Sequence, residues 1–350
     1  MKAITRLERD AGIVFLGTMI ANAGSYAFHV VLSRHLGPPS YGVLGAVVAI
    51  ATAVAIPAAG LQYTVARRVA IGDEDAARAG LRLGIGVGLA LTLTTLLSLP
   101  VLPRFLHTSS APLAWLALGM VPFGALPAFT GVLQGRRRFG ALATTLCVVG
   151  LGRALGAALV AVLGLGVAAG VAVMSLSTLA AVAVAGWSAG PLRGLATGAS
   201  VRAEVLRTAV PFLAVATVSS LDVVLARHYL APTAAGQYAA ASIAGKIMLW
   251  APAAVAVTTF PHFADRANDA RATLARALRM LAAICTAALV GTVILREPLI
   301  GTVFGARYLP AADVIVIVAV AMTALAIVHV LATFAVARGT YLIGPALLAG

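Results

Sequence analysis

Long runs of apolar residues, separated by short polar or charged segments, dominate this sequence. A helix needs about 20 mostly apolar residues to cross a bilayer. The runs are apolar on all faces and lack the alternation typical of barrel strands, so they predict membrane-spanning helices. We expect about eleven crossings. The complete spans are residues 11–33, 42–65, 83–103, 112–133, 141–163, 167–188, 208–229, 237–260, 279–296 and 312–336.

The last apolar run is incomplete. It begins near Tyr341 and reaches Gly350 without a polar tail, which indicates a truncated final helix. The fold class expected from the pattern is therefore an all-α integral membrane protein with an incomplete last helix.

Composition supports a membrane protein and argues against a soluble one. Of 350 residues, 61% are hydrophobic and 10% are charged, whereas soluble domains carry about a quarter charged residues. The net charge of +14 does not indicate a nucleic-acid partner, because the basic residues form short clusters between apolar runs. Cys147 and Cys285 lie inside such runs, so they predict packing residues and no metal site.

The basic residues also predict the orientation of the chain. Most of them lie in every second connecting segment, starting with the N-terminal one, and cytoplasmic loops are the ones enriched in Lys and Arg. The N-terminus is therefore expected in the cytoplasm. The arginines on the opposite side are Arg34, Arg104, Arg227, Arg296 and Arg307.

An internal repeat divides the sequence. Residues 30–35 are nearly identical to residues 223–228, and Pro38 and Gly42 then correspond to Pro232 and Gly236. An even number of predicted helices separates the copies, so the repeats are parallel in the membrane, as in many transporters. The expected organisation is an N-terminal six-helix bundle at 1–190, a cytoplasmic linker at 191–207 and a truncated C-terminal bundle at 208–350.

The repeated segments carry a family resemblance. The stretch VVLSRHLGPPSYGVLGAVVAI at 30–50, with 57–70, resembles the opening helix pair of bacterial polysaccharide or oligosaccharide flippases of the MOP superfamily. Residues 221–261 resemble the seventh and eighth helices of the same family. The resemblance implies two six-helix bundles, a bacterial inner-membrane location and alternating-access movement of lipid-linked glycans to the outer leaflet.

One charged residue lies near the middle of a predicted span. Arg153 is about 12 residues into its run, roughly 18 Å deep, where a charge costs roughly 2.5–3.5 kcal/mol. It is a candidate for binding a diphosphate, since a guanidinium fork suits phosphate oxygens. A buried ion pair is the structural alternative.

A second group of candidates lies in the second half. Asp222 and Lys246 fall at similar depths, roughly 12–14 Å, on consecutive antiparallel helices. The alternatives are a structural ion pair between them, binding of a phosphate by Lys246, or titration of Asp222 with a coupling proton or sodium ion. Trp250 is one turn from Lys246 and is a candidate for stacking on a sugar ring.

Polar side chains also follow one face of the first span. Asn22, Ser25 and His29 are spaced for one helix face, which predicts a cavity wall or interhelical hydrogen bonds. His29 corresponds to Asp222 in the repeat. Arg34 and Arg227, at the outer ends of equivalent helices, predict either an electrostatic gate or snorkelling to headgroups.

These observations favour a flippase for a lipid-linked oligosaccharide over an enzyme. The expected partners are membrane lipid, the glycan lipid and polysaccharide-assembly proteins. No cofactor is expected, and a proton or sodium ion is the candidate for coupling. The alternatives are a cation-coupled MATE-type drug exporter and, in another class, a membrane-embedded glycosyl- or acyltransferase, for which the inner acids Asp73, Glu74 and Asp75 are the candidates.

Overall fold

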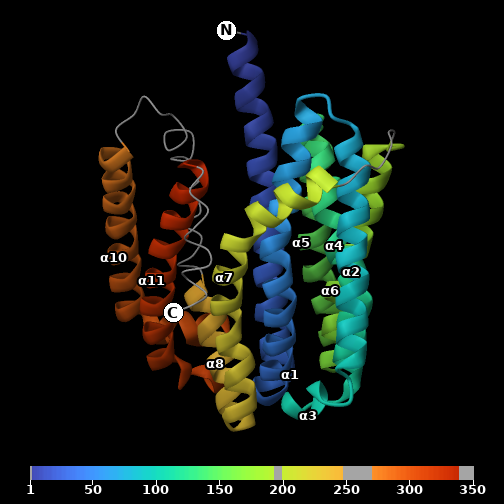
Figure 1. Ribbon diagram of the computed structural model, residues 1–350. Coiled ribbons are helices and arrows are strands. Elements are labelled where there is room, and N and C mark those ends of the chain that lie inside the picture. The colour runs from blue at the N-terminus through green and yellow to red at the C-terminus, as the bar shows by residue number, and fades with distance from the viewer. Residues whose placement is uncertain (1, 193–198, 247–269, 339–350) are drawn as a thin grey trace. The chain divides into compact units, whose positions relative to one another are not determined.

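The computed structural model describes residues 2–192, 199–246 and 270–338 (Figure 1). Within these ranges the regular secondary structure is entirely helical, which confirms the predicted all-α class. The elements are α1 (Lys2–Ala70), α2 (Asp75–Leu97), α3 (Leu102–Phe105), α4 (Ser110–Gly135), α5 (Phe139–Val162), α6 (Val167–Ala189), α7 (Ala199–Tyr229), α8 (Pro232–Gly245), α10 (Ala270–Val303), the 3-10 helix η2 (Ala306–Tyr308) and α11 (Ala311–Arg338).

The helices have the length and composition of membrane spans. Of those in the described residues, 7 are long and apolar enough to cross a bilayer, including a 59-residue stretch of α1 that is long enough for two crossings. The chain is therefore a multi-pass membrane protein. The predicted incomplete helix from Tyr341 to Gly350, and the second half of the span predicted at 237–260, lie outside the described residues.

The connection between the first two predicted spans is much shorter than the sequence indicated. The predicted spans leave residues 34–41 between them, but the helical assignment continues and is interrupted only at Gly37, with φ 71° and ψ 169°. A positive φ is readily adopted by glycine alone. Pro38 follows directly, and proline is well suited to the first turn of a new helix. A single residue therefore redirects the chain.

Two other helices begin earlier than their apolar runs. Helix α2 begins at Asp75 and α7 begins at Ala199, so both include charged residues before the spanning segment. Part of the predicted linker at 191–207 is therefore helical, while residues 193–198 lie outside the described part. Short α3 replaces the end of the span predicted at 83–103. Hydrophobicity locates the membrane-crossing part of a helix, whereas the ends outside it are decided by local contacts.

The chain forms two compact units that do not follow chain order. Unit 1 comprises Met1–Leu36 with Val54–Ala209, and unit 2 comprises Gly37–Ala53 with Val210–Gly350. Residues 37–53 therefore group with the second half of the sequence, and the first turns of α7 group with the first half.

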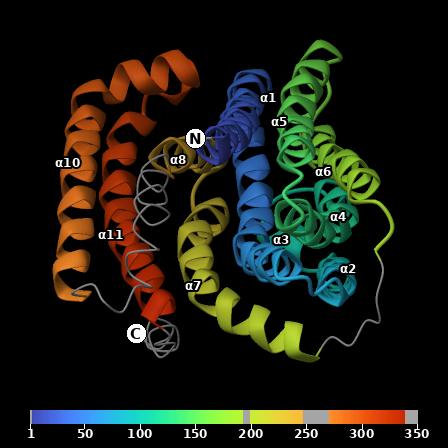
Figure 2. The ribbon, with the colours of Figure 1, turned by 90° about the horizontal axis from the view of Figure 1, so that it is seen from above.

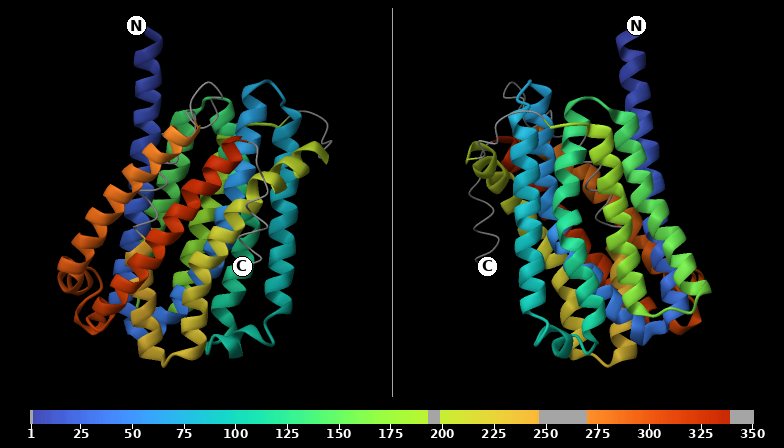
Figure 3. Two further views of the ribbon diagram at one scale, coloured as in Figure 1. Left: turned by 60° about the vertical axis from the view of Figure 1, so that its left-hand side comes forward. Right: turned by 90° about the vertical axis from the view of Figure 1, so that its right-hand side faces the viewer.

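Unit 1 is built around α4. Helices α2 and α6 pack on α4, and α5 packs on α6, so these helices run side by side (Figure 3, right). Gly84 of α2 and Gly124 of α4 bring the two backbones together, since a β-carbon at Gly84 would fall 2.2 Å from the Gly124 carbonyl oxygen. The buried core around Val65, Val132 and Ala185 links α1, α4 and α6.

Unit 2 contains α8, α10 and α11. Helix α11 packs against both α8 and α10, and the pairing of α10 with α11 is visible from above (Figure 2). Cys285 is buried there with Leu281 and Val330, as a packing residue. Large apolar side chains such as Ile294 and Ile317 are exposed on the outer faces, which suits contact with lipid.

Candidate functional site

A close crossing of α1 and α5 positions Arg153. A β-carbon at Gly24 would fall 2.2 Å from the Gly150 carbonyl oxygen, so the two backbones touch. Ser25 follows Gly24, and Arg153 lies one turn after Gly150. The Arg153 Nη1 therefore reaches the Ser25 Oγ, to which it donates a hydrogen bond of 3.3 Å. The sequence predicted both residues as candidates but gave no sign that they meet.

The Arg153 guanidinium is poorly satisfied. Its Nε is buried and has no hydrogen-bond partner, and among the described residues its one hydrogen bond is to the neutral hydroxyl of Ser25. A charge in a membrane span normally pairs with an opposite charge or faces water. The guanidinium can therefore donate further hydrogen bonds to an anion. The alternative of a buried ion pair is not seen among the described residues.

The remaining polar residues of the first span lie beside this contact. Asn22 and His29 are half-buried on α1, as is Ser25. His29 contacts the neighbouring Phe28 edge-on, with ring centroids 5.2 Å apart. Thr18 on the same helix donates to the Val14 carbonyl at 2.8 Å. Ser25 on this face accepts the hydrogen bond from Arg153.

Asp222 and Lys246 come together in unit 2, as their spacing predicted. The Lys246 Nζ lies 3.9 Å from the Asp222 Oδ1, and each side chain is 20% exposed. Two residues that the sequence analysis did not single out complete this group. Ser242 donates to the Asp222 Oδ2 at 2.9 Å, and the Tyr238 hydroxyl donates to the same oxygen at 3.3 Å.

The spacing of α8 explains this arrangement. Tyr238, Ser242 and Lys246 are four residues apart, which places them on one face of a helix. The four-residue spacing is visible in the sequence. It does not by itself mark Tyr238 and Ser242 as site residues, because Tyr and Ser are also common packing residues. Trp250 continues the same spacing but lies outside the described residues.

Arg34 and Arg227 are equivalent in the sequence repeat but differ in their surroundings. Arg34 is exposed. Arg227 is only 5% exposed, and its Nη1 donates to the Pro39 carbonyl oxygen at 3.3 Å. Arg227 therefore does not extend into solvent, and its contacts hold the start of the second half of α1 within unit 2.

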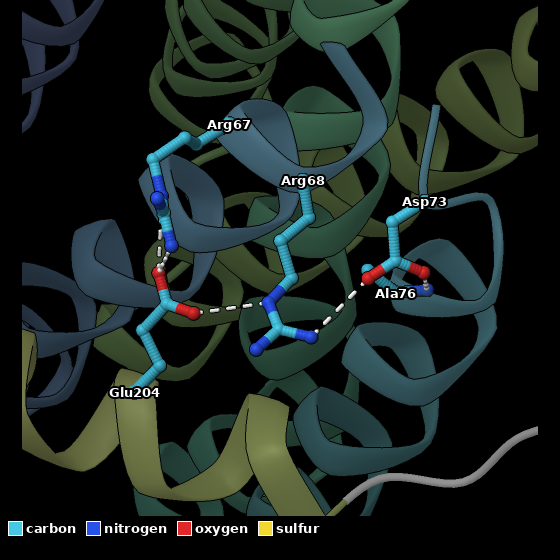
Figure 4. A network of polar contacts seen from close by, with 5 residues as sticks. All are labelled: Arg67, Arg68, Asp73, Ala76 and Glu204. Carbon is cyan, nitrogen blue, oxygen red and sulfur yellow. Dashed lines mark hydrogen bonds and ion pairs between the residues drawn. The ribbon is translucent and has the colours of Figure 1, made fainter. Parts of the chain in front are cut away.

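A network of ionic contacts fixes the start of α7 in unit 1 (Figure 4). Glu204 accepts hydrogen bonds from Arg67 and from the Arg68 Nε, the latter at 2.9 Å. Arg68 also donates to Asp73, whose other oxygen accepts the Ala76 amide at 3.2 Å and so caps the start of α2.

Glu74 belongs to a second contact at the same end of unit 1. Arg136 donates two hydrogen bonds to the Glu74 carboxylate and a third to the Ala189 carbonyl oxygen, which joins the start of α2 to the end of α6. The hydrogen bond from Arg136 lowers the pKa of Glu74. The candidate acids Asp73 and Glu74 are therefore engaged in structural contacts.

Comparison with known proteins identifies the family to which the chain belongs. The sequence matches the family described as "Polysaccharide biosynthesis protein" over residues 31–313. The chain belongs to this family. No protein with a curated description gives a significant match. The resemblance predicted from residues 30–50, 57–70 and 221–261 is thus confirmed.

Solved structures show which fold this polysaccharide biosynthesis protein has. It is similar to an inward-facing MATE-family multidrug resistance transporter of the MOP superfamily, with TM-score 0.70 and 15% identity over 95% of this chain and 87% of that one. A eukaryotic MATE transporter gives 0.65 and 13% over 96% and 84%. A MOP-superfamily transporter from Pyrococcus furiosus, whose title reports a binding pocket of reverse polarity, gives 0.57 and 15% over 94% and 84%. The fold is that of the MOP superfamily.

Proposed function

We propose that this chain is a flippase that moves a lipid-linked oligosaccharide from the cytoplasmic to the outer leaflet for cell-surface polysaccharide biosynthesis. The family supports the link to polysaccharide, and the fold, shared with MATE transporters, supports transport by alternating access. The proposed location is a bacterial inner membrane with the N-terminus in the cytoplasm. Its support is the concentration of basic residues in alternate connecting segments.

The observation that carries this proposal is the state of Arg153. A guanidinium within a spanning helix, with a buried Nε and one hydroxyl partner among the described residues, needs an anion to complete its hydrogen bonds. A lipid-linked oligosaccharide carries such an anion at the junction between lipid and sugar. The lipid tail stays in the bilayer, while the phosphate and sugar groups need polar contacts.

Transport by this route requires no cofactor. Inward- and outward-open states both have to be populated, and a cargo shifts their balance only if it binds one state more tightly. A proton or a sodium ion is the candidate for coupling. Contact with polysaccharide-assembly proteins stays a prediction.

A cation-coupled drug exporter is the second candidate, because several structural neighbours are MATE transporters. A site for cationic drugs needs an available carboxylate. Asp222 is an acid within a predicted span, and it accepts hydrogen bonds from Tyr238 and Ser242 and faces Lys246. This arrangement favours an anionic cargo.

A membrane-embedded transferase is the candidate from another class. It needs an acid or base at the membrane surface. Asp73 caps α2 and Glu74 pairs with Arg136, so both acids already have structural partners. The proposal therefore remains transport without catalysis.

The test is transport in proteoliposomes that contain the purified chain and a labelled undecaprenyl-diphosphate oligosaccharide. Exposure of the label to a membrane-impermeant glycan-modifying enzyme reports movement between leaflets. Arg153→Ala is expected to lower the rate at least about tenfold, and Arg153→Lys is expected to retain part of it. Arg104→Ala is the matched control, since Arg104 is an exposed arginine of short α3. Wild-type rates in Arg153→Ala, or export of a cationic dye but no glycan lipid, would overturn the proposal.

A further inference from the structure

The Asp222 carboxylate is held unevenly. Its Oδ2 accepts hydrogen bonds from both Tyr238 and Ser242, and Ser242 is fully buried. Its Oδ1 is buried, has no hydrogen-bond partner among the described residues, and faces the Lys246 ammonium at 3.9 Å. Two neutral donors thus fix the carboxylate in place without removing its charge.

The Lys246 ammonium is held much less firmly. An ammonium has three N–H donors, and 3.9 Å exceeds the length of an N–H···O hydrogen bond. Among the described residues, Asp222 is the one acid that forms an ion pair with Lys246. The pair is therefore balanced in charge without a hydrogen bond between its two members, and the flexible stem of Lys246 lets the ammonium move.

We propose that Asp222 is a built-in counter-anion for Lys246, anchored by Tyr238 and Ser242, and that a phosphate or diphosphate group displaces it from Lys246. The identity of that anion as a glycan-lipid headgroup rests on the proposed function. A phosphate offers several charged acceptors to the ammonium, which makes shorter and stronger hydrogen bonds than a contact at 3.9 Å.

The anchoring has a purpose in a transport cycle. After the anion leaves, an unpaired ammonium within a predicted span would cost free energy. The fixed Asp222 then forms the ion pair with Lys246 again. Because Tyr238 and Ser242 hold the carboxylate away from hydrogen-bond contact, the pair stays weak enough to open for the next anion.

The arrangement belongs to the second half of the chain alone. In the alignment of the two repeats, His29 corresponds to Asp222. The residues that correspond to Tyr238, Ser242 and Lys246 are Leu44, Val48 and Thr52, respectively. The first repeat therefore has neither the acid nor the donor face, so the group does not follow from the repeat itself.

The sequence offers a selective probe, because Lys2 and Lys246 are its lysines. In a Lys2→Arg background, an amine-acylating reagent followed by mass spectrometry reports the state of Lys246 in the full chain. Inorganic pyrophosphate serves as the anion, and the concentration that half-protects Lys246 gives its affinity. We expect Asp222→Asn to tighten pyrophosphate binding at least about tenfold, since a competing negative charge is removed.

The anchoring residues are expected to have the opposite effect. Without Tyr238 or Ser242 the carboxylate is free to bind Lys246 directly, so Tyr238→Phe and Ser242→Ala should weaken pyrophosphate binding. A purely structural role would not produce effects of opposite sign. Matched controls that should not change the affinity are Asp313→Asn, Tyr229→Phe and Ser219→Ala; Asp313 and Tyr229 are exposed and Ser219 bonds within its own helix.

The outcomes separate this inference from the proposed function. Unchanged or weaker pyrophosphate binding in Asp222→Asn overturns the counter-anion role, even if the protein moves glycan lipid. Opposite effects of Asp222→Asn and Tyr238→Phe support it, even if no glycan lipid moves, in which case the flippase proposal alone fails. If Asp222→Asn does not fold, protection of Lys246 by pyrophosphate in the Lys2→Arg protein decides, and its absence overturns the inference.

Discussion

Gly42 and Gly236, which are equivalent residues of the sequence repeat, lie against each other in unit 2. A β-carbon at Gly42 would fall 2.9 Å from the Gly236 backbone nitrogen, and one at Gly236 would fall 1.8 Å from the Pro38 carbonyl oxygen. Both glycines are therefore required by the approach of two backbones. The repeat preserves a contact between the starts of α8 and of the second part of α1.

This contact predicts a large effect of a side chain at Gly236. We expect Gly236→Val to lower the free energy of unfolding by about 1–3 kcal/mol, since the clash is with backbone that cannot rotate away. Gly291→Val is the control, because a β-carbon at Gly291 of α10 meets nothing within 4 Å. Thermal unfolding in detergent measures both. Equal melting temperatures for the two variants would contradict the close contact.

Replacement of Arg153 by an apolar residue is expected to stabilise the protein and to abolish transport. The buried Nε of Arg153 has no partner in the part of the chain that the structure describes, so Arg153→Leu should raise the free energy of unfolding by about 1 kcal/mol or more while it abolishes transport. Arg104→Leu, at an exposed position, should change neither quantity. Calorimetry and the transport assay give the two measurements. A destabilised Arg153→Leu variant would show that the guanidinium serves packing.

Glu204 is expected to fix the start of α7 to unit 1. Glu204→Gln weakens its contacts with Arg67 and Arg68, and since Arg67 is largely exposed we expect a loss of about 1 kcal/mol. Combining Arg68→Glu with Glu204→Arg should recover part of the loss, which a double-mutant cycle quantifies. Glu297→Gln, at an exposed acid, is the control. Additive single effects in the cycle would rule out a direct interaction.

The pairing of Glu74 with Arg136 predicts a pH dependence of stability. The hydrogen bond from Arg136 lowers the pKa of Glu74 in the folded protein, so its stabilising contribution is present above the pKa of an unfolded glutamate. That contribution is lost as the pH falls through the lowered folded value. The melting temperatures of wild type and Glu74→Gln should therefore differ at about pH 7 and converge by about pH 3. A difference that is the same at both pH values would contradict this.

The sequence predicted that Asp222 and Lys246 lie at one depth, because helix rise alone places them so on consecutive helices, and it left open whether they pair with each other. It did not predict Tyr238 and Ser242, although their spacing from Lys246 was visible. Which oxygen of Asp222 each donor reaches depends on how α7 faces α8, and periodicity within one helix carries no such information.

The same division applies to Arg153 and to the helix ends. The position of Arg153 within an apolar run marked it as a costly charge, but its contact with Ser25 depends on Gly24 and Gly150 touching across α1 and α5. Likewise, the start of α7 belongs to unit 1 because Glu204 binds Arg67 and Arg68. Glu204 lies outside any apolar run, so hydrophobicity did not predict this contact.

By itself, the sequence determined that this chain lies in a membrane, that it is helical, and which segments are apolar enough to cross, because the hydrocarbon core imposes a minimum apolar length that can be counted along the chain. The tertiary structure alone decided that Gly37 is the break in α1, that residues 37–53 join unit 2, and which polar side chains meet. Those outcomes depend on contacts between residues far apart in sequence, where a glycine in place of a larger residue changes the distance between two backbones.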